Sequence, residues 1–87
     1  MIEVLFFGKL RETMGAASWQ LDLGTIGSEP TAEQVLAAAF DYFGGEEAST
    51  ADSRQGLRCA INQSMSDFSA RVEDNDEVAF FPPVTGG

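Results

Sequence analysis

One amphipathic segment, Thr31 to Phe43, constrains the fold of this chain more than any other feature. Its sequence TAEQVLAAAFDYF places apolar residues three or four positions apart, which is the spacing of one helical face. Thr31 and Gln34 stand in the positions of a capping box, and Gly44 is a candidate C-cap. We predict one main helix that covers a sheet, with an apolar stripe formed by Val35, Leu36, Ala39, Phe40 and Phe43.

Strand-like segments lie on both sides of this helix. Ile2 to Phe7 is rich in strand formers, and Ser18 to Leu23 alternates apolar and polar residues. The ten residues between them are too many for a tight hairpin but still suit an antiparallel pair. After the helix, Leu57 to Met65 predicts a strand, a turn near its Asn-Gln pair and a short return strand. Glu77 to Phe81 is the last strand, because proline follows it.

The order of these elements restricts how the strands can pair. A helix between the opening strand pair and the later strands lets the last strand lie parallel to the first in one mixed sheet. We therefore predict an α+β fold of the β-grasp class, the arrangement of ubiquitin-like domains. A ferredoxin-like split fold is less favoured because the sequence has one strong helix. Residues 1–81 should form the domain and residues 82–87 an extended C-terminal tail.

Composition excludes several classes of function. A net charge of −9, with one lysine and four arginines, opposes binding to nucleic acid. The absence of histidine excludes a Ser/His/Asp triad and a His-bearing zinc site. The acidic segment Gly45 to Gly56 lacks the ligand spacing of an EF-hand, so we interpret it as a solvated surface loop and expect no metal. We also expect no permanently bound cofactor. No stretch approaches the roughly 18 apolar residues of a membrane span, and we expect a cytoplasmic protein without membrane contact.

Cys59 is the single cysteine and cannot form an internal disulfide, which fits a reducing compartment. It stands between Arg58 and Ala60 in a predicted strand, and the chain has no histidine to activate it. We interpret it as a packed, inert thiol rather than a sulfur-handling residue.

Strand alternation places two aromatic residues on the sheet face away from the helix. If Val4 and Phe6 face the helix, Phe7 faces away, and Phe81 faces away if Phe80 faces the helix. One helix leaves that outer face uncovered, so we predict an exposed apolar patch at Phe7 and Phe81 that binds a partner. The alternatives are a loop that folds over the patch, or a register shifted by one residue.

The C-terminal segment FFPPVTGG has the features of a handle for another enzyme. Pro82 and Pro83 end sheet pairing and direct the chain outward, and the next four residues span up to about 14 Å. Gly86 and Gly87 lack a Cβ, so they fit a narrow channel in which the terminal carboxylate is processed. That carboxylate is ionised at neutral pH and is a poor electrophile. It must therefore be activated first, for example by adenylation with ATP.

Three segments, IEVLFFGKLRE, AINQSM and DNDEVAFFPPVTGG, resemble the small, sulfur-carrier subunits of molybdopterin synthases. The resemblance covers nearly the whole chain and is most specific at its C-terminal end. The segments LGTIGSE and Glu46 to Gln55 match nothing in that family and carry no inference.

The resemblance implies a specific function. In that family an E1-like adenylating enzyme uses ATP to activate the terminal glycine, a sulfide donor converts it to a thiocarboxylate, and the tail enters the large subunit. There the sulfur passes to cyclic pyranopterin monophosphate and forms the dithiolene of molybdopterin. On this chain Gly87 would carry the sulfur, while Val84, Thr85 and Gly86 would line the channel of the large subunit.

The resemblance also implies that Phe7, Met65 and Phe81 contact the large subunit, and Phe7 and Phe81 follow from strand alternation as well. The small subunit is not catalytic alone. It supplies a thiocarboxylate nucleophile, and tethering to a folded carrier raises the effective concentration of that nucleophile. The other catalytic groups belong to the partner.

Other functions on the same fold remain open. A sulfur carrier of another pathway, such as thiamine synthesis, and a ubiquitin-like modifier of lysines share the tail chemistry. The FFPPVTGG ending and the outer-face aromatics favour the molybdopterin pathway. A non-catalytic β-grasp binding module would show no activation at Gly87.

Overall fold

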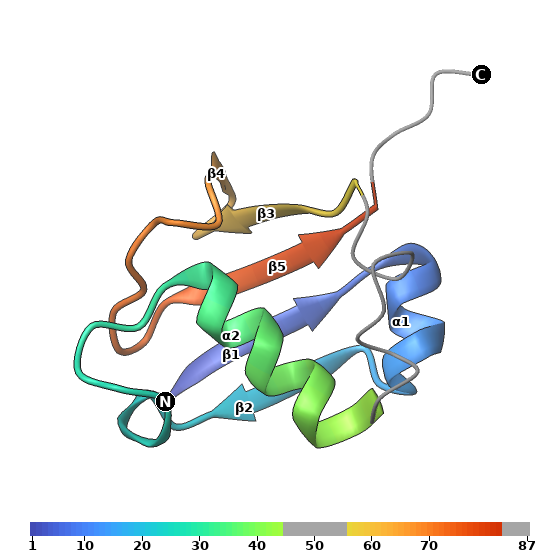
Figure 1. Cartoon of the computed structure of the whole chain (residues 1–87). Helices are drawn as coiled ribbons and strands as arrows, with labels where there is room; N and C mark the ends of the chain where they lie inside the picture. Colours follow the sequence, from blue (N-terminus) through green and yellow to red (C-terminus); the bar gives the residue numbers. More distant parts are fainter. Residues whose placement is uncertain (45–55, 83–87) are drawn as a thin grey trace.

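The computed structural model describes residues 1–44 and 56–82, which form a five-stranded sheet with α2 lying across one face (Figure 1). The predicted loop from Glu46 to Gln55 and the tail from 83 to 87 lie outside the described residues. The elements in chain order are β1 (Ile2–Phe6), α1 (Gly8–Met14), β2 (Ser18–Leu21), the 3₁₀-helix η1 (Leu23–Thr25), α2 (Ala32–Ala39), the π-helix η2 (Phe40–Gly44), β3 (Arg58–Ile61), β4 (Ser64–Ser66) and β5 (Glu77–Phe81).

The strands are ordered β2-β1-β5-β3-β4, and the neighbours are antiparallel except for the parallel pair β1 and β5. In this pair Val4 lies opposite Val78, and Phe6 lies opposite Phe80. The predicted β-grasp topology, with the last strand parallel to the first in a mixed sheet, is confirmed. Because β5 is the central strand, Pro82 follows it at the middle of one end of the sheet.

The core lies between α2 and the sheet face turned toward it. The predicted inward residues of both central strands are buried, which confirms the expected alternation. Thr31 accepts a hydrogen bond from the backbone N–H of Gln34, and the Gln34 side chain accepts one from the backbone N–H of Thr31, so the predicted capping box is formed. The innermost residues include Ile2, Val4, Phe6, Val35, Leu36, Ala39, Val78 and Phe80.

A second α-helix differs from the sequence prediction. The segment from Gly8 to Ala17, expected as a plain connection, contains α1, with Leu10 and Met14 buried. Two apolar residues four positions apart are too few to reveal a helical period. A seven-residue helix is also unstable on its own, so packing on the core decides this conformation.

The main helix also ends differently from the prediction. Its α-helical part stops at Ala39, and the chain continues as the π-helix η2, so Gly44 is not the C-cap of α2. The wider turn of a π-helix accompanies ring contacts of Phe43 with Phe6 and Trp19, at 5.8 and 5.4 Å between centroids. These tertiary contacts have no counterpart in the local sequence pattern.

Strand β2 ends two residues earlier than predicted. It stops at Leu21, and Asp22 accepts a hydrogen bond from the backbone N–H of Gly24 at 3.0 Å. This side-chain cap begins η1, so the carboxylate competes with continued strand pairing.

The predicted turn between β3 and β4 is confirmed and is tied to the start of β5. Asn62 and Gln63 have φ values of 51° and 70°, the left-handed region that a tight hairpin requires. The Asn62 side chain donates to Asp76 Oδ1 at 2.9 Å and accepts from the backbone N–H of Glu77 at 3.0 Å. The turn therefore holds β5 in register.

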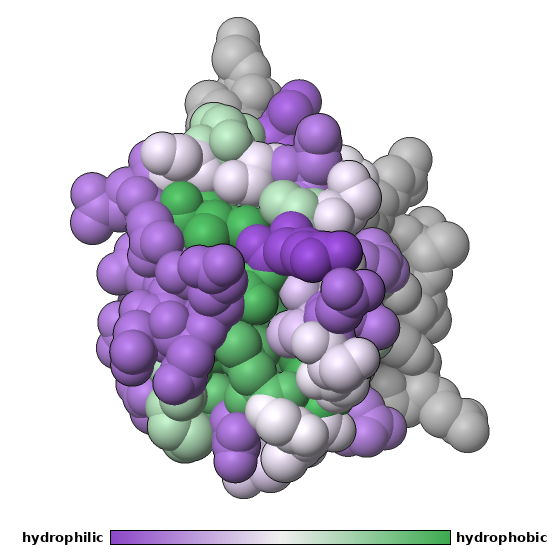
Figure 2. All heavy atoms as spheres, turned by 90° about the vertical axis from the view of Figure 1, so that its left-hand side faces the viewer, coloured by the Kyte–Doolittle hydropathy of each residue, from purple (hydrophilic) through white to green (hydrophobic). Residues whose placement is uncertain are grey.

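The core reaches the surface at the end of the molecule where β1 and β5 begin. Figure 2 shows an apolar strip there between polar residues. This end lies opposite to the end from which Pro82 leaves β5 (Figure 1). Half-buried apolar residues pack around the whole core and are not confined to this end: Trp19, Leu23, Ile26, Phe43, Leu57, Ile61 and Phe68.

Within residues 1–44 and 56–82, no helix has the length and apolar character needed to cross a bilayer.

Candidate functional site

An apolar row crosses the sheet face turned away from α2. Strand register places Leu5 beside Ala79, Ala79 beside Ala60, and Ala60 beside Met65. Residues opposite each other in adjacent strands project to the same face, so these four side chains line up across β1, β5, β3 and β4. Ala60 and Ala79 have no large side chains, which leaves the middle of the row flat.

Two aromatic residues extend this row toward the start of the tail. Phe81 lies opposite Arg58 on β3. The backbone N–H of Phe7 donates to Phe80 O at 3.1 Å, which continues the β1/β5 ladder by one residue and sets Phe7 beside Phe81. We call the six residues Leu5, Phe7, Ala60, Met65, Ala79 and Phe81 the outer-face patch.

The exposed part of the outer-face patch contains the three residues assigned to a partner interface by the sequence. Phe7 and Met65 are 49% and 62% exposed, and Phe81 is half-buried. The structure therefore brings these three residues onto one face, and the outward direction predicted for Phe7 and Phe81 is correct. Their contact with a partner stays a prediction.

Charged residues frame the outer-face patch asymmetrically. Lys9 and Arg11 are exposed on α1, and Arg58 is exposed opposite Phe81, so positive charge lies near the start of the tail. At the far end, Glu3 lies opposite Glu77 on the central pair. A partner with the complementary arrangement would be steered into one orientation, because charges around an interface act mainly on encounter rate and register.

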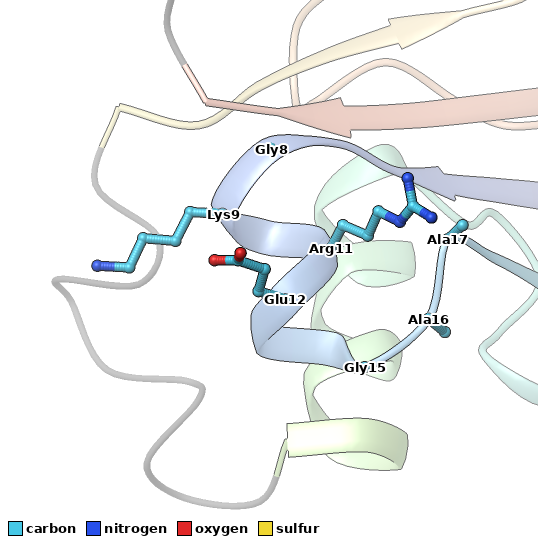
Figure 3. Close-up of a pocket in the computed structure, with 7 residues that line it drawn as sticks. All are labelled: Gly8, Lys9, Arg11, Glu12, Gly15, Ala16 and Ala17. Atoms are coloured by element: carbon cyan, nitrogen blue, oxygen red, sulfur yellow. The ribbon is translucent and has the colours of Figure 1, made fainter.

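An open hollow of about 670 Å³ lies against α1 (Figure 3). In Figure 3 the Arg11 side chain is directed toward Ala17, and Lys9 points away from the helix. Among residues 1–44 and 56–82, no three His, Cys, Asp or Glu side chains are grouped closely enough to hold a metal ion. The lining has the composition of a solvated helix face: Gly8, Lys9, Arg11, Glu12, Gly15, Ala16 and Ala17.

The tail leaves the domain beside the first residue of α1. Gly8 has a φ of +60°, and a Cβ at this position would lie 2.8 Å from Pro82 Cγ and 3.1 Å from Pro82 Cδ. The proline ring therefore occupies the space that a side chain of residue 8 would need. The predicted sulfur-bearing residue Gly87 and the predicted channel residues Val84, Thr85 and Gly86 lie outside the described residues.

Cys59 is fully buried in the sheet, on the core side. Its Sγ donates to the backbone oxygen of Ser66 at 3.2 Å. Burial raises the pKa of the Cys59 thiol, and the negative charge of Asp67 raises that pKa further. The thiol is therefore held in its protonated, unreactive form, in agreement with an inert packed residue.

If the chain carries sulfur as the sequence resemblance implies, Cys59→Ala should leave that loading and transfer unchanged. It should lower the free energy of unfolding by about 1 kcal/mol, because it removes a small buried group. Urea denaturation measures the stability, and intact-mass spectrometry measures the loading. A folded Cys59→Ala chain that no longer accepts sulfur would place the thiol in the chemistry.

The flat centre of the outer-face patch and the packing of Pro82 on Gly8 are absent from the sequence prediction. Alternation within β3 and β5 limits which residues share a face, but the register between strands decides which of them become neighbours. The sequence shows only that Gly8 directly follows the predicted strand Ile2 to Phe7. That position does not reveal which residue Gly8 contacts. Gly8 and Pro82 are 74 positions apart in the sequence, and Ala60 and Ala79 are 19 positions apart.

Comparison with known proteins identifies close relatives. A family model described as the ThiS family matches residues 4–87. The chain is 36% identical to the molybdopterin synthase sulfur carrier subunit of Haemophilus influenzae over 87 residues, which cover both chains completely. It is 39% identical to the protein of the same name from Escherichia coli over 90 residues, again with both chains fully covered.

Solved structures agree with the fold. The crystal structure of SAMP1 from Haloferax volcanii has a TM-score of 0.76 at 22% identity, with 99% of this chain and 98% of the other covered. A complex of subunits 1 and 2 of the molybdopterin-converting factor from Helicobacter pylori contains a chain with a TM-score of 0.62 at 20% identity, with 99% of this chain and 97% of that one covered. At these identities the structures support the β-grasp fold. Because the family model matches residues 4–87, the chain belongs to the ThiS family.

Proposed function

We propose that this chain carries sulfur on its C-terminal glycine as the small subunit of a molybdopterin synthase. One observation carries the proposal: the tail begins at the end of central strand β5, directly beside the outer-face patch. A partner that covers the patch is therefore next to the start of the tail. The shared name of the full-length relatives supports the same pathway.

The proposed chemistry takes place at the carboxyl carbon of Gly87. A carboxylate oxygen attacks the α-phosphorus of ATP and pyrophosphate leaves, which gives an acyl adenylate. Sulfide then attacks the acyl carbon and AMP leaves, which gives a thiocarboxylate. Its sulfur attacks an electrophilic carbon of cyclic pyranopterin monophosphate, a bond from that carbon to oxygen breaks with its electron pair passing to the oxygen, and a thioester then joins the carrier to the acceptor. Water finally attacks the acyl carbon and breaks its bond to sulfur, so the sulfur stays on the acceptor and Gly87 regains a carboxylate.

The partners supply every group that this chain lacks. An E1-like adenylating enzyme binds the ATP, a sulfide donor delivers the sulfur, and the large subunit holds the acceptor. This chain contributes the outer-face patch for docking and the tail for delivery. Because activation consumes ATP, we place these reactions in the cytoplasm.

Two related functions use the same activated glycine. A carrier for another sulfur pathway would also be thiocarboxylated, and a modifier would instead be transferred to lysine amines. A β-grasp binding module would undergo neither reaction. The product formed at Gly87 and the acceptor of its sulfur separate these possibilities.

The proposed function is tested by loading and transfer in sequence. Incubation of the chain with ATP, its E1-like enzyme and a sulfide source should produce, by intact-mass spectrometry, the increase expected when one oxygen is replaced by sulfur. Addition of the large subunit and cyclic pyranopterin monophosphate should then return the original mass and form molybdopterin. A chain that never gains the mass would overturn the carrier function, whereas a loaded chain that fails to react with this acceptor would point to another pathway.

A further inference from the structure

Gly8 and Pro82 form a close contact between the two central strands at the point where the tail begins. Gly8 follows β1 by two residues, and Pro82 directly follows β5. Figure 3 shows Gly8 at the turn where the chain passes from β1 into α1. The contact thus joins the first helix to the base of the tail.

The contact requires the absence of a side chain at residue 8. A Cβ on Gly8 would lie 2.8 Å from Pro82 Cγ, whereas ordinary contacts of a Cβ lie at 3.4–4 Å. The atom in the way belongs to a rigid ring that is fused to the backbone, so it cannot turn aside as the end of a long side chain can. Relief of the overlap must therefore change the pucker or position of the Pro82 ring, or move the backbone of residue 8 away from it, and either change alters the contact at which the tail begins.

We propose that Gly8 is a positioning residue for the tail, because its missing side chain forms a notch that seats the Pro82 ring and sets the direction in which the tail leaves the sheet. The inference rests on the proposed function, since it concerns delivery of the Gly87 carboxyl group. It assigns to α1, which carries Gly8, a role separate from docking: the outer-face patch binds the partner, and the notch aims the tail.

The notch is separated from the reacting atom by a short length of chain. Five residues lie between Pro82 and the end of Gly87, at most about 17 Å of chain. A change of backbone direction at Pro82 alters where and in which direction these five residues start, and the reactive carbon lies at their far end. Misplacement of a reacting atom by about 1 Å lowers the rate roughly a hundredfold. The position of Pro82 at the start of the tail should therefore affect the rate of sulfur transfer.

Gly8→Ala is the direct test, and Gly15→Ala is its matched control. Gly8 is the first residue of α1 and Gly15 is its C-cap, and both have positive φ values, +60° and +73°. A Cβ on Gly15 would meet nothing within 4 Å, so this substitution introduces the same backbone strain without a clash. On thermal unfolding both variants should lose stability to backbone strain, and any further loss in Gly8→Ala measures the clash with Pro82.

The readout is single-turnover transfer from chains that carry a preformed C-terminal thiocarboxylate, so the activating enzyme is bypassed. At a saturating concentration of the large subunit, Gly8→Ala should transfer sulfur about tenfold to a hundredfold more slowly than the intact chain. Gly15→Ala should stay within about twofold. Affinity for the large subunit, measured by calorimetry, should remain similar for both variants because the outer-face patch is unchanged.

Pro82→Ala provides the rescue that a merely structural role would not give. Replacement of the ring removes the atoms that meet the new Cβ, so Gly8→Ala should slow transfer much less in the Pro82→Ala background than in the intact chain. Such non-additivity in the double-mutant cycle is the signature of direct contact. Additive effects would overturn the inference.

An NMR measurement on the free chain tests the Gly8–Pro82 contact without any sulfur transfer. The intact protein should show nuclear Overhauser contacts between the Gly8 α-protons and the Pro82 γ- and δ-protons. In Gly8→Ala the contacts between the α-proton of residue 8 and these Pro82 protons should weaken or disappear. Absence of these contacts in the intact chain would refute the notch. If the contacts are present but the intact thiocarboxylate transfers no sulfur, the proposed function fails; if it transfers at the same rate as Gly8→Ala, the notch has no role in positioning.

Discussion

A chain that lacks Gly87 should fold like the intact protein and support no molybdopterin formation. The deletion lies beyond β5, so the free energy of unfolding should change by less than about 0.5 kcal/mol. The new terminal residue is again a glycine, but its carboxyl carbon ends about 3.5 Å short of the original position. Since the reacting atoms must approach within about 3.5 Å of each other, this shortfall should abolish transfer in an assay of molybdopterin formation.

A chain lengthened by one glycine is the matched control for this deletion. It has the same terminal chemistry and the opposite error in length, so it should also fail in transfer. Both variants should still bind the large subunit through the outer-face patch. Molybdopterin formation by the shortened chain at the rate of the intact chain would contradict the role assigned to Gly87.

Phe7→Asp should weaken binding of the large subunit by about 2–4 kcal/mol, because it replaces a large apolar contact at the tail end of the outer-face patch with a charge that binding would desolvate. The domain should not lose stability. Phe7 is half-exposed and occupies the N-cap of α1, with φ −126°, ψ 158° and no side-chain cap. Aspartate is favoured at such positions, so the substitution should not weaken the start of the helix. Calorimetric titration measures the affinity, and thermal unfolding measures the stability.

Tyr42→Asp controls for the added charge and the lost aromatic ring. Tyr42 is 69% exposed, and its ring stacks on Trp19 at 5.1 Å, away from the outer-face patch. This variant should bind the large subunit within about twofold of the intact chain. Phe81→Asp should behave like Phe7→Asp if the chain stays folded. Equal affinities of Phe7→Asp and Tyr42→Asp would remove Phe7 from the interface.

Much of the fold could be predicted because local patterns and topology agreed. The capping box at Thr31 and Gln34, the alternation along β1 and β5, and the turn at Asn62 each depend on residues close together in the sequence. These elements, taken in order, leave few ways to build one sheet. The outward direction of Phe7 followed from the same alternation.

The features that could not be predicted depend on distant contacts. Leu10 and Met14 fold as a helix because the core covers them, and the π-helix at Phe40–Gly44 accompanies ring contacts with Phe6 and Trp19. The neighbours of Met65 in the outer-face patch are set by strand register. The seat of Pro82 requires the positive φ of Gly8, which the sequence allows but does not impose.

The parallel ladder between β1 and β5 has a consequence for how long the protein survives. It joins a β1–β2 unit from the first half of the chain to a β3–β4–β5 unit from the second half, and the outer-face patch draws residues from both. A partner bound there spans the seam and holds the two halves together. Because such a partner binds the closed sheet and not the opened one, association must slow unfolding and proteolysis of the carrier by mass action. The free carrier, between encounters with its partners, is the form most exposed to degradation.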